Sequence, residues 1–129
     1  MKLNSLTPNL MVKSVNDTLD FYTDILGFEL LQTVPDNGTF DWGFVQKDSV
    51  LIMFQKDHSI REEYPELKNY KEGGALTLYI KVDDLPKWYE HIKDKTNVIK
   101  PLHKTFYGAN EFAIQDPDGF ILTFSDILT

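Results

Sequence analysis

The chain has 129 residues, of which 42% are hydrophobic and 26% are charged, as in a soluble globular protein. Its 13 basic and 20 acidic residues give a net charge of −7, which argues against a nucleic-acid partner because phosphate contacts need a basic surface. The absence of cysteine excludes disulfides, thiolate nucleophiles and cysteine-based metal sites. No segment resembles a signal peptide or a membrane span, so we expect a cytoplasmic protein with no membrane partner.

The first half of the chain predicts a strand, a helix and three further strands. A strand is expected over residues 7–13, and Ser14 can cap a helix whose apolar face includes Val15 and Leu19. Gly27 is expected to end this helix, because glycine readily adopts the left-handed conformation common at helix C-termini. The three strands that follow are predicted over residues 28–34, 39–46 and 49–55.

The second half predicts the same elements in the same order. Residues 58–74 indicate a short helix and a flexible connection that ends in Gly73-Gly74. A strand over 76–82 then precedes a helix that Asp84 caps and that Asn97 is expected to end. The last three strands are predicted over residues 98–102, 110–115 and 119–125.

The two halves match each other at an offset of 70 residues, without a gap. Val12 corresponds to Val82, and Trp42 corresponds to Phe112. Because the secondary-structure signals repeat together with the residues, the sequence predicts an α+β fold built from two βαβββ modules. We expect one domain over residues 1–129, with module 1 at about 5–57, the connector at 58–74 and module 2 at about 75–127.

Alternation along the strands separates an apolar face from a mixed face. Even-numbered residues such as Ile52 and Leu122 predict the face that packs against the helices. The odd-numbered face suits a concave cleft with a few polar groups, although a solvent-exposed face or a dimer contact would give the same pattern. The residues of the odd-numbered face that we expect to contact a ligand are Thr7, Asn9, Met11, Leu51, Met53, Thr77, Tyr79, Glu111 and Thr123.

Two aromatic residues could add to this cleft. Tyr107 precedes Gly108 in a loop near the predicted rim. Trp42 is even-numbered like the core residues, so packing under the helix and contact with a ligand both remain open for it. Asp116-Pro117-Asp118-Gly119 could suggest a metal site, but its residue types predict a turn.

Several short motifs occur in an order that is typical of one family. They are Asp20-Phe21-Tyr22, Leu26-Gly27-Phe28, Tyr107-Gly108-Ala109-Asn110-Glu111-Phe112 and the Asp-Pro-Asp-Gly turn. With them, the chain resembles the vicinal oxygen chelate (VOC) superfamily of glyoxalases, bleomycin resistance proteins and dioxygenases. Thr7-Pro8-Asn9-Leu10 and Trp42 are most similar to the bleomycin-resistance branch. The resemblance covers nearly the whole chain and implies a cup-shaped mixed sheet and a homodimer.

The resemblance also implies where a metal would bind. Metal-dependent members of the superfamily carry ligands on the first and last strand of each module, at positions that are here Thr7, Met53, Thr77 and Thr123. Three hydroxyls and a thioether do not offer the imidazoles and carboxylates that a catalytic divalent ion needs. We therefore expect no metal and no other cofactor. None of the three histidines lies at these positions, and we expect them at the surface.

These observations favour a metal-free binding protein that sequesters an aromatic or amphipathic small molecule, as the bleomycin-resistance branch does. The alternative is a metal-free, glyoxalase-like lyase or isomerase that acts on a small metabolite with Glu111 as its base, although a structural hydrogen-bonding role is favoured for that carboxylate. A third possibility is that the odd-numbered face binds another protein and no ligand. The sequence does not decide whether the protein is an enzyme.

Overall fold

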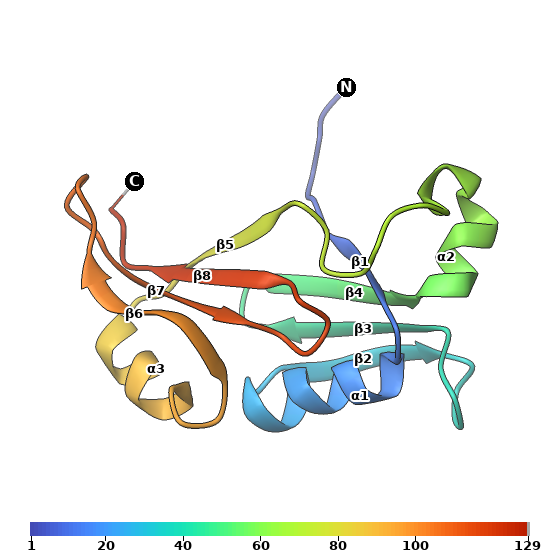
Figure 1. Ribbon diagram of the computed structural model, residues 1–129, viewed down its shortest axis with the longest axis horizontal. Coiled ribbons are helices and arrows are strands. Elements are labelled where there is room, and N and C mark those ends of the chain that lie inside the picture. The colour runs from blue at the N-terminus through green and yellow to red at the C-terminus, as the bar shows by residue number, and fades with distance from the viewer. Residues whose placement is uncertain (129) are drawn as a thin grey trace. The chain divides into compact units, whose positions relative to one another are not determined.

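The computed structural model describes residues 1–128, and their contacts divide them into unit 1, Met1–Glu72, and unit 2, which begins at Gly73. Within residues 1–128, each unit contains a four-stranded mixed sheet with helices (Figure 1). The fold is therefore α+β and built from two βαβββ modules, as predicted. A single domain with a cup-shaped sheet stays a prediction.

Unit 1 has the strand order β1-β4-β3-β2, in which β1 runs parallel to β4 and the other neighbours are antiparallel. Its helix α1 continues into the π-helical segment η1. Its elements are β1 (Asn9–Val12), α1 (Val15–Asp20), η1 (Phe21–Ile25), β2 (Glu29–Val34), β3 (Trp42–Lys47), β4 (Val50–Lys56), α2 (Asp57–Glu63) and the 3-10 helix η2 (Pro65–Leu67).

The first strand is shorter than the sequence predicted, and this changes the position of Thr7. Pro8 has no backbone N–H and so cannot donate a hydrogen bond to a neighbouring strand. Its carbonyl still accepts a hydrogen bond from the Met53 amide at 2.9 Å. The paired strand therefore starts at Asn9, and the prediction that Thr7 lies within it is wrong.

Helix α1 forms where the sequence predicted it and covers the even-numbered face of β4. The Ser14 side chain accepts a hydrogen bond from the Asp17 amide at 3.2 Å, and Gly27 has a φ of 78° just beyond the helical segment. On the sheet, Gly43 lies so close to α1 that a Cβ there would be 2.9 Å from a methyl carbon of Leu19. The small residue therefore lets α1 pack closely on β3.

Helix α2 follows β4 directly and covers part of the opposite face of the sheet (Figure 1). It contacts β1 and β4, and its Ile60 is buried. The Gln55 side chain, which is on the odd-numbered face of β4, donates hydrogen bonds to Ser59 and Glu63 of α2. The sequence predicted a helix in the connector, but not that this helix closes one end of the mixed face.

Unit 2 repeats this arrangement with the strand order β5-β8-β7-β6, in which β5 and β8 are parallel and the other neighbours antiparallel. Helix α3 contacts β7, and the buried ring of Phe112 packs against Tyr89 of α3. The elements are β5 (Thr77–Lys81), α3 (Leu85–Ile92), β6 (Asn97–Lys104), β7 (Asn110–Gln115) and β8 (Ile121–Ser125).

The start of α3 agrees with the sequence prediction, whereas its end does not. The Asp84 side chain accepts a hydrogen bond from the Lys87 amide at 3.4 Å and caps the helix. The helix already ends at Ile92, and the Thr96 hydroxyl donates to the Ile92 carbonyl at 2.9 Å. The prediction that Asn97 ends the helix is therefore wrong, since Asn97 is the first residue of β6.

None of the helices in the part of the chain that the structure describes has the length and apolar character needed to cross a membrane.

Candidate functional site

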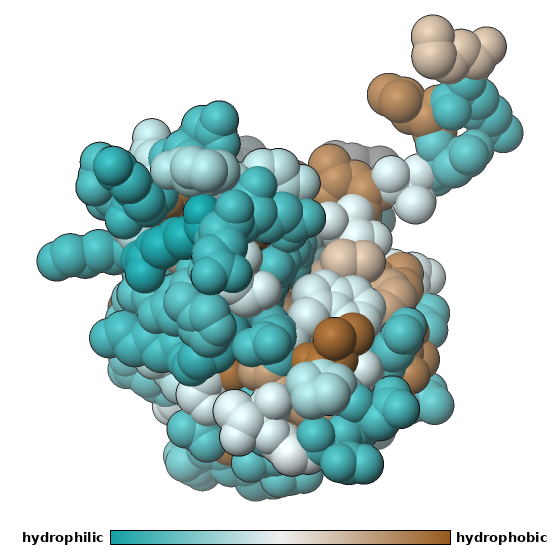
Figure 2. Space-filling model, turned by 90° about the vertical axis from the view of Figure 1, so that its right-hand side faces the viewer, coloured by the Kyte–Doolittle hydropathy of each residue, from teal (hydrophilic) through white to brown (hydrophobic). Residues whose placement is uncertain are grey.

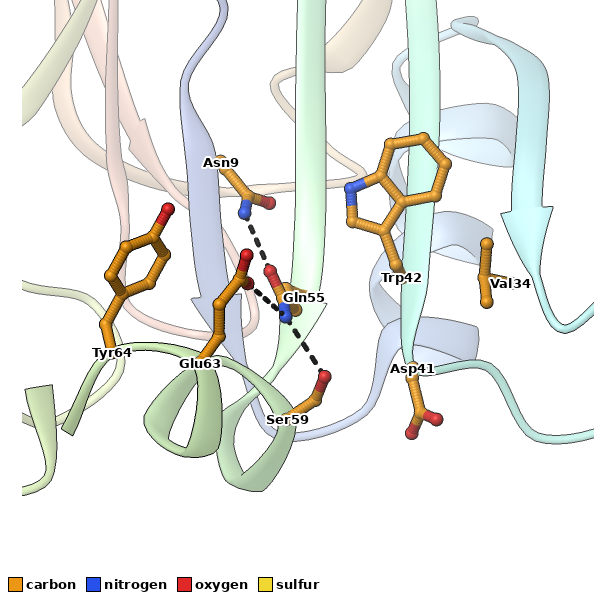
Figure 3. Close-up of a pocket in the computed structure, with 8 residues that line it drawn as sticks. All are labelled: Asn9, Val34, Asp41, Trp42, Gln55, Ser59, Glu63 and Tyr64. Atoms are coloured by element: carbon orange, nitrogen blue, oxygen red, sulfur yellow. Dashed lines mark hydrogen bonds between the residues drawn. The ribbon is translucent and has the colours of Figure 1, made fainter.

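A cavity of about 490 Å³ lies at one end of the unit 1 sheet, beside α2 (Figure 3). This volume falls within the usual range for small-molecule pockets. Strands β1, β2, β3 and β4 contribute side chains, and α2 with the residue after it forms a further wall. The lining residues are Asn9, Val34, Asp41, Trp42, Gln55, Ser59, Glu63 and Tyr64.

A hydrogen-bonded network centred on Gln55 forms the polar part of the pocket. Gln55 is only 9% exposed, and its Oε1 accepts a hydrogen bond from Asn9 Nδ2 at 2.9 Å. Its Nε2 donates to Ser59 Oγ at 3.0 Å and to Glu63 Oε1 at 3.1 Å. Both ends of the buried amide are therefore satisfied, and its orientation is fixed.

Trp42 supplies the aromatic surface of the pocket. It lies opposite Gln55 in the β3–β4 register, so the two side chains share one face of the sheet, while the neighbouring Gly43 faces α1. The indole is half-buried and its ring centroid is 5.8 Å from that of Phe44. Trp42 therefore does not pack under α1, because it is on the opposite face of the sheet and lines the cavity, while its contact with a ligand stays a prediction.

Two carboxylates lie among the residues that line the pocket, Glu63 on α2 and Asp41 immediately before β3. Asp41 Oδ1 lies 3.8 Å from Nε2 of His58, and both side chains are at least half exposed. Figure 2 views this end of unit 1 and shows hydrophilic side chains gathered over α2, with a smaller apolar area beside them. The pocket thus combines an apolar wall with an acidic one.

A second group of predicted residues converges in unit 2, around Glu111 on β7. Glu111 is only 6% exposed, and its Oε2 accepts hydrogen bonds from the hydroxyls of Tyr79 and Tyr107, the latter at 2.6 Å. The Tyr79 hydroxyl also lies 2.9 Å from Ser125 Oγ, which accepts a hydrogen bond from the Ile127 amide. The two tyrosines are about half exposed, so their rings lie between this buried carboxylate and solvent.

The environment of Glu111 keeps it ionised. Burial alone would raise the pKa of this carboxyl, but the hydrogen bonds from Tyr107, Tyr79 and Ser125 outweigh burial and lower it below its ordinary value. His103, which lies opposite Glu111 in the β6–β7 register, lowers the pKa further. The hydrogen bond to Glu111 correspondingly raises the pKa of the Tyr107 hydroxyl. This geometry supports the structural role that the sequence favoured for Glu111.

The remaining predicted contact residues lie outside both groups. Leu51 and Met53 are half-buried on the mixed face of β4, and Met11 is buried at the end that α2 covers. Thr77 is exposed, and Thr123 is half-buried opposite Tyr79 in the β5–β8 register.

The residues at the family's metal positions do not fit a metal. They provide threonine hydroxyls and one thioether, with no imidazole or carboxylate. Among residues 1–128, no group of three or more His, Cys, Asp or Glu side chains is arranged to hold a metal ion.

Sequence reasoning named only Asn9 and Trp42 among the eight residues that line the pocket. It missed Ser59, Glu63 and Tyr64 because it treated residues 58–74 only as a connector. Ser59 and Glu63 are spaced by four residues, as on one face of a helix, but this spacing does not indicate that the face packs against β4. No sequence pattern indicates that Asp41, Val34 and Tyr64 line a pocket.

Comparison with known proteins is consistent with this fold. The model of the Glyoxalase/Bleomycin resistance protein/Dioxygenase superfamily matches residues 2–124. The chain belongs to this superfamily. A comparison with curated proteins gave no match.

Solved structures of the superfamily fold are similar over nearly the whole chain. TioX from Micromonospora sp. ML1 has a TM-score of 0.77 at 16% identity, covering 98% of this chain and 100% of TioX. A protein of unknown function from Agrobacterium tumefaciens has a TM-score of 0.78 at 22% identity, covering 99% and 97%. The bleomycin-binding protein of Streptomyces verticillus, solved with copper(II)-bleomycin, has a TM-score of 0.66 at 22% identity, covering 96% of each chain. At these identities the likeness shows the fold alone.

Proposed function

We propose that this protein of the VOC superfamily binds an aromatic or amphipathic small molecule without changing it chemically and without a metal. The observation that carries this proposal is the unit 1 pocket, in which the half-buried Trp42 faces a fixed network of polar groups. An apolar wall with a few oriented polar groups is the usual form of a small-molecule site. The bleomycin-binding protein with the same fold gives a precedent for the binding of a small molecule.

The other predicted contacts enter the proposal as two separate surfaces, each within one unit. In unit 1 we include Thr7, Met11, Leu51 and Met53, and in unit 2 the exposed rings of Tyr79 and Tyr107 with Thr77, Thr123 and Glu111. We also propose that the protein is a homodimer, as the resemblance to the superfamily implies. Native mass spectrometry checks this directly, because it reports the number of subunits and any retained organic ligand together.

The alternative lyase or isomerase reaction with Glu111 as base has less support. A general base works best with a pKa near the working pH. Glu111 is buried, accepts hydrogen bonds from two phenols, and has a lowered pKa. This environment stabilises the ionised carboxylate and makes it a weak base.

Replacing Trp42 with alanine tests the proposal. We expect the affinity for a planar aromatic probe such as acridone to fall about tenfold, because stacking on an aromatic side chain contributes about 1–3 kcal/mol. Fluorescence titration of acridone measures the dissociation constant. The control is Phe106→Ala, which removes a fully exposed aromatic ring outside the pocket and should leave the affinity unchanged. Equal affinity of wild type and Trp42→Ala, or no acridone binding at all, would contradict the proposal.

A further inference from the structure

We infer that two copies of this chain pair along strand β2, antiparallel to each other and about a two-fold axis. The inference rests on the homodimer that we propose above and names the surface through which it forms. It does not depend on the binding of a ligand. It follows from three features of the chain, namely the exposed edge at β2, the protected edge at the equivalent strand of unit 2, and the pattern of residues along β2.

Strand β2 is an exposed edge of the unit 1 sheet. It ends the strand order β1-β4-β3-β2, so one side of its backbone has no neighbouring strand in the sheet (Figure 1). Five of its six residues are exposed. Leu30, Leu31 and Val34 are 45%, 42% and 49% exposed. An edge strand presents unpaired N–H and C=O groups to other chains, and here apolar side chains accompany them.

The other edge of the same sheet does not offer such a surface. Strand β1 has only four residues, and three of them, Leu10, Met11 and Val12, are buried. Short edge strands pair poorly with other chains. Within unit 1, β2 is therefore the edge at which a further strand can add.

The equivalent edge strand of unit 2 carries residues that prevent pairing. Strand β6 ends the order β5-β8-β7-β6, as β2 ends the order in unit 1. At the offset of 70 residues, Leu30 corresponds to Lys100 and Leu31 corresponds to Pro101. Lysine and proline are residue types with which natural sheets protect their edges. The same position in the fold is thus protected in unit 2 and open in unit 1.

This difference favours a second copy of the chain that uses the same strand. Pairing of β2 with β6 of another copy would be head-to-tail and could continue into an open chain, but Pro101 and Lys100 oppose it. Pairing of β2 with β2 closes about a two-fold axis and leaves no free β2 edge. The expected assembly is therefore a dimer and not a filament.

The residues of β2 suit antiparallel pairing with themselves. One register places Leu30 of each copy opposite Leu31 of the other, so that the exposed leucines meet at the axis. The same register places Glu29 opposite Gln32. Glu29 is the only charged residue of the strand, and the two copies of it lie on opposite sides of the axis. No like charges face each other directly in this arrangement.

A bulge at Leu31 allows a specific test of this edge. The register of β2 with β3 pairs Leu30 with Val45 and Gln32 with Phe44, and it passes over Leu31. The extra residue of a bulge is left unpaired in its ladder. Leu31→Pro therefore alters the free edge without removing a paired residue from the unit 1 sheet.

Sedimentation velocity measures the association. A contact along one strand is smaller than a standard interface, so we expect a reversible dimer with a Kd on the order of 10 μM, measured between about 5 and about 200 μM. Leu31→Pro should raise this Kd about tenfold or more. Leu30→Lys introduces the residue type that β6 has at this position and should have the same effect, because the two new lysines lie close together at the axis.

Ile99→Lys is the matched control. Ile99 is 41% exposed on β6, so this variant makes the same change at the edge that we expect not to pair, and the Kd should stay unchanged. Thermal denaturation shows whether each variant keeps its fold. Amide hydrogen exchange adds a local measurement, since β2 of wild type should become more protected as the concentration rises, whereas β6 should not.

The outcomes separate this inference from the proposals on which it rests. A wild type that stays monomeric at the highest concentration would contradict both the homodimer and the pairing of β2. If wild type is a dimer that folded Leu31→Pro and Leu30→Lys variants retain, or that Ile99→Lys weakens equally, the homodimer stands and the pairing of β2 is wrong. Assemblies larger than a dimer would contradict the two-fold arrangement. Acridone titration tests the binding function independently of all these results.

Discussion

Replacing Glu111 with alanine is expected to lower the free energy of unfolding by about 2–4 kcal/mol, as measured by urea denaturation near neutral pH. The carboxylate is almost fully buried and is the shared acceptor for the Tyr79 and Tyr107 hydroxyls, so its removal takes away two charge-assisted hydrogen bonds. The cavity left by the side chain adds to the cost. Because both tyrosines are about half exposed, their hydroxyls can reach water, which keeps the loss below that of a fully buried network.

Two conservative variants test which part of this network matters. Tyr107→Phe removes one donor and should cost about 1 kcal/mol. Glu111→Gln keeps the shape of the side chain but removes its charge. Its loss in the free energy of unfolding should lie between those of Tyr107→Phe and Glu111→Ala. A Glu111→Ala variant as stable as wild type would show that the carboxylate is not part of the structural network, and would return it to consideration as a functional group.

The lowered pKa of Glu111 also predicts a dependence of stability on pH. Its pKa lies below the ordinary value of 4.5, so the folded state releases the proton more readily than the unfolded state does. The stabilisation is therefore fully present above about pH 5 and is lost as the pH falls through the folded-state value. Glu111→Gln should lose less stability than wild type between about pH 5 and pH 2, which urea denaturation over this range measures. If the free energy of unfolding depended on pH in the same way in both proteins, the lowered pKa of Glu111 would be contradicted.

The parts of the fold that the sequence predicted well are those fixed by local signals. Ser14 and Asp84 cap helices because their side chains accept from amides three residues later, a feature that the sequence displays directly. Successive side chains of a strand point to opposite faces of the sheet, so even-numbered core residues such as Ile52 and Leu122 share one face and are buried. The prediction for the end of α3 was wrong because the Thr96 hydroxyl donates to the carbonyl of Ile92, the last residue of the helix. Many residue types can follow such a helix end, so the sequence does not mark its position.

The candidate site was only partly predictable, because it depends on which face of the sheet α2 covers. Asn9 and Trp42 were candidates from strand position and residue type, and both line the pocket. Glu63 and Ser59 lie in a segment whose own pattern shows a helix but not its packing partner. Only the contact with Gln55, a tertiary interaction, brings them to the pocket. Their role follows from packing between elements, which one sequence does not display.

The second large effect is expected at the Asp116-Pro117-Asp118-Gly119 turn, which the sequence predicted as a turn and not as a metal site. Asp116 is only 4% exposed, and its Oδ1 accepts hydrogen bonds from the amides of Asp118 at 3.0 Å and Phe120 at 2.8 Å. Asp116→Ala leaves these amides without their acceptor next to the buried Phe120, so we expect a loss of about 2–4 kcal/mol in the free energy of unfolding by urea denaturation.

Asn retains one side-chain oxygen that can accept from the same amides, so Asp116→Asn should recover at least half of this loss. Asp94→Ala serves as the control, because this residue is exposed and follows α3 outside the turn. If the carboxylate acts through the turn, its Oδ1 serves as the acceptor for two backbone amides, and added Ca²⁺ or Mg²⁺ leaves the unfolding midpoint of wild type unchanged. A midpoint that rises with either ion in wild type but not in Asp116→Ala would instead show a metal site, and would overturn the interpretation of this motif as a structural turn.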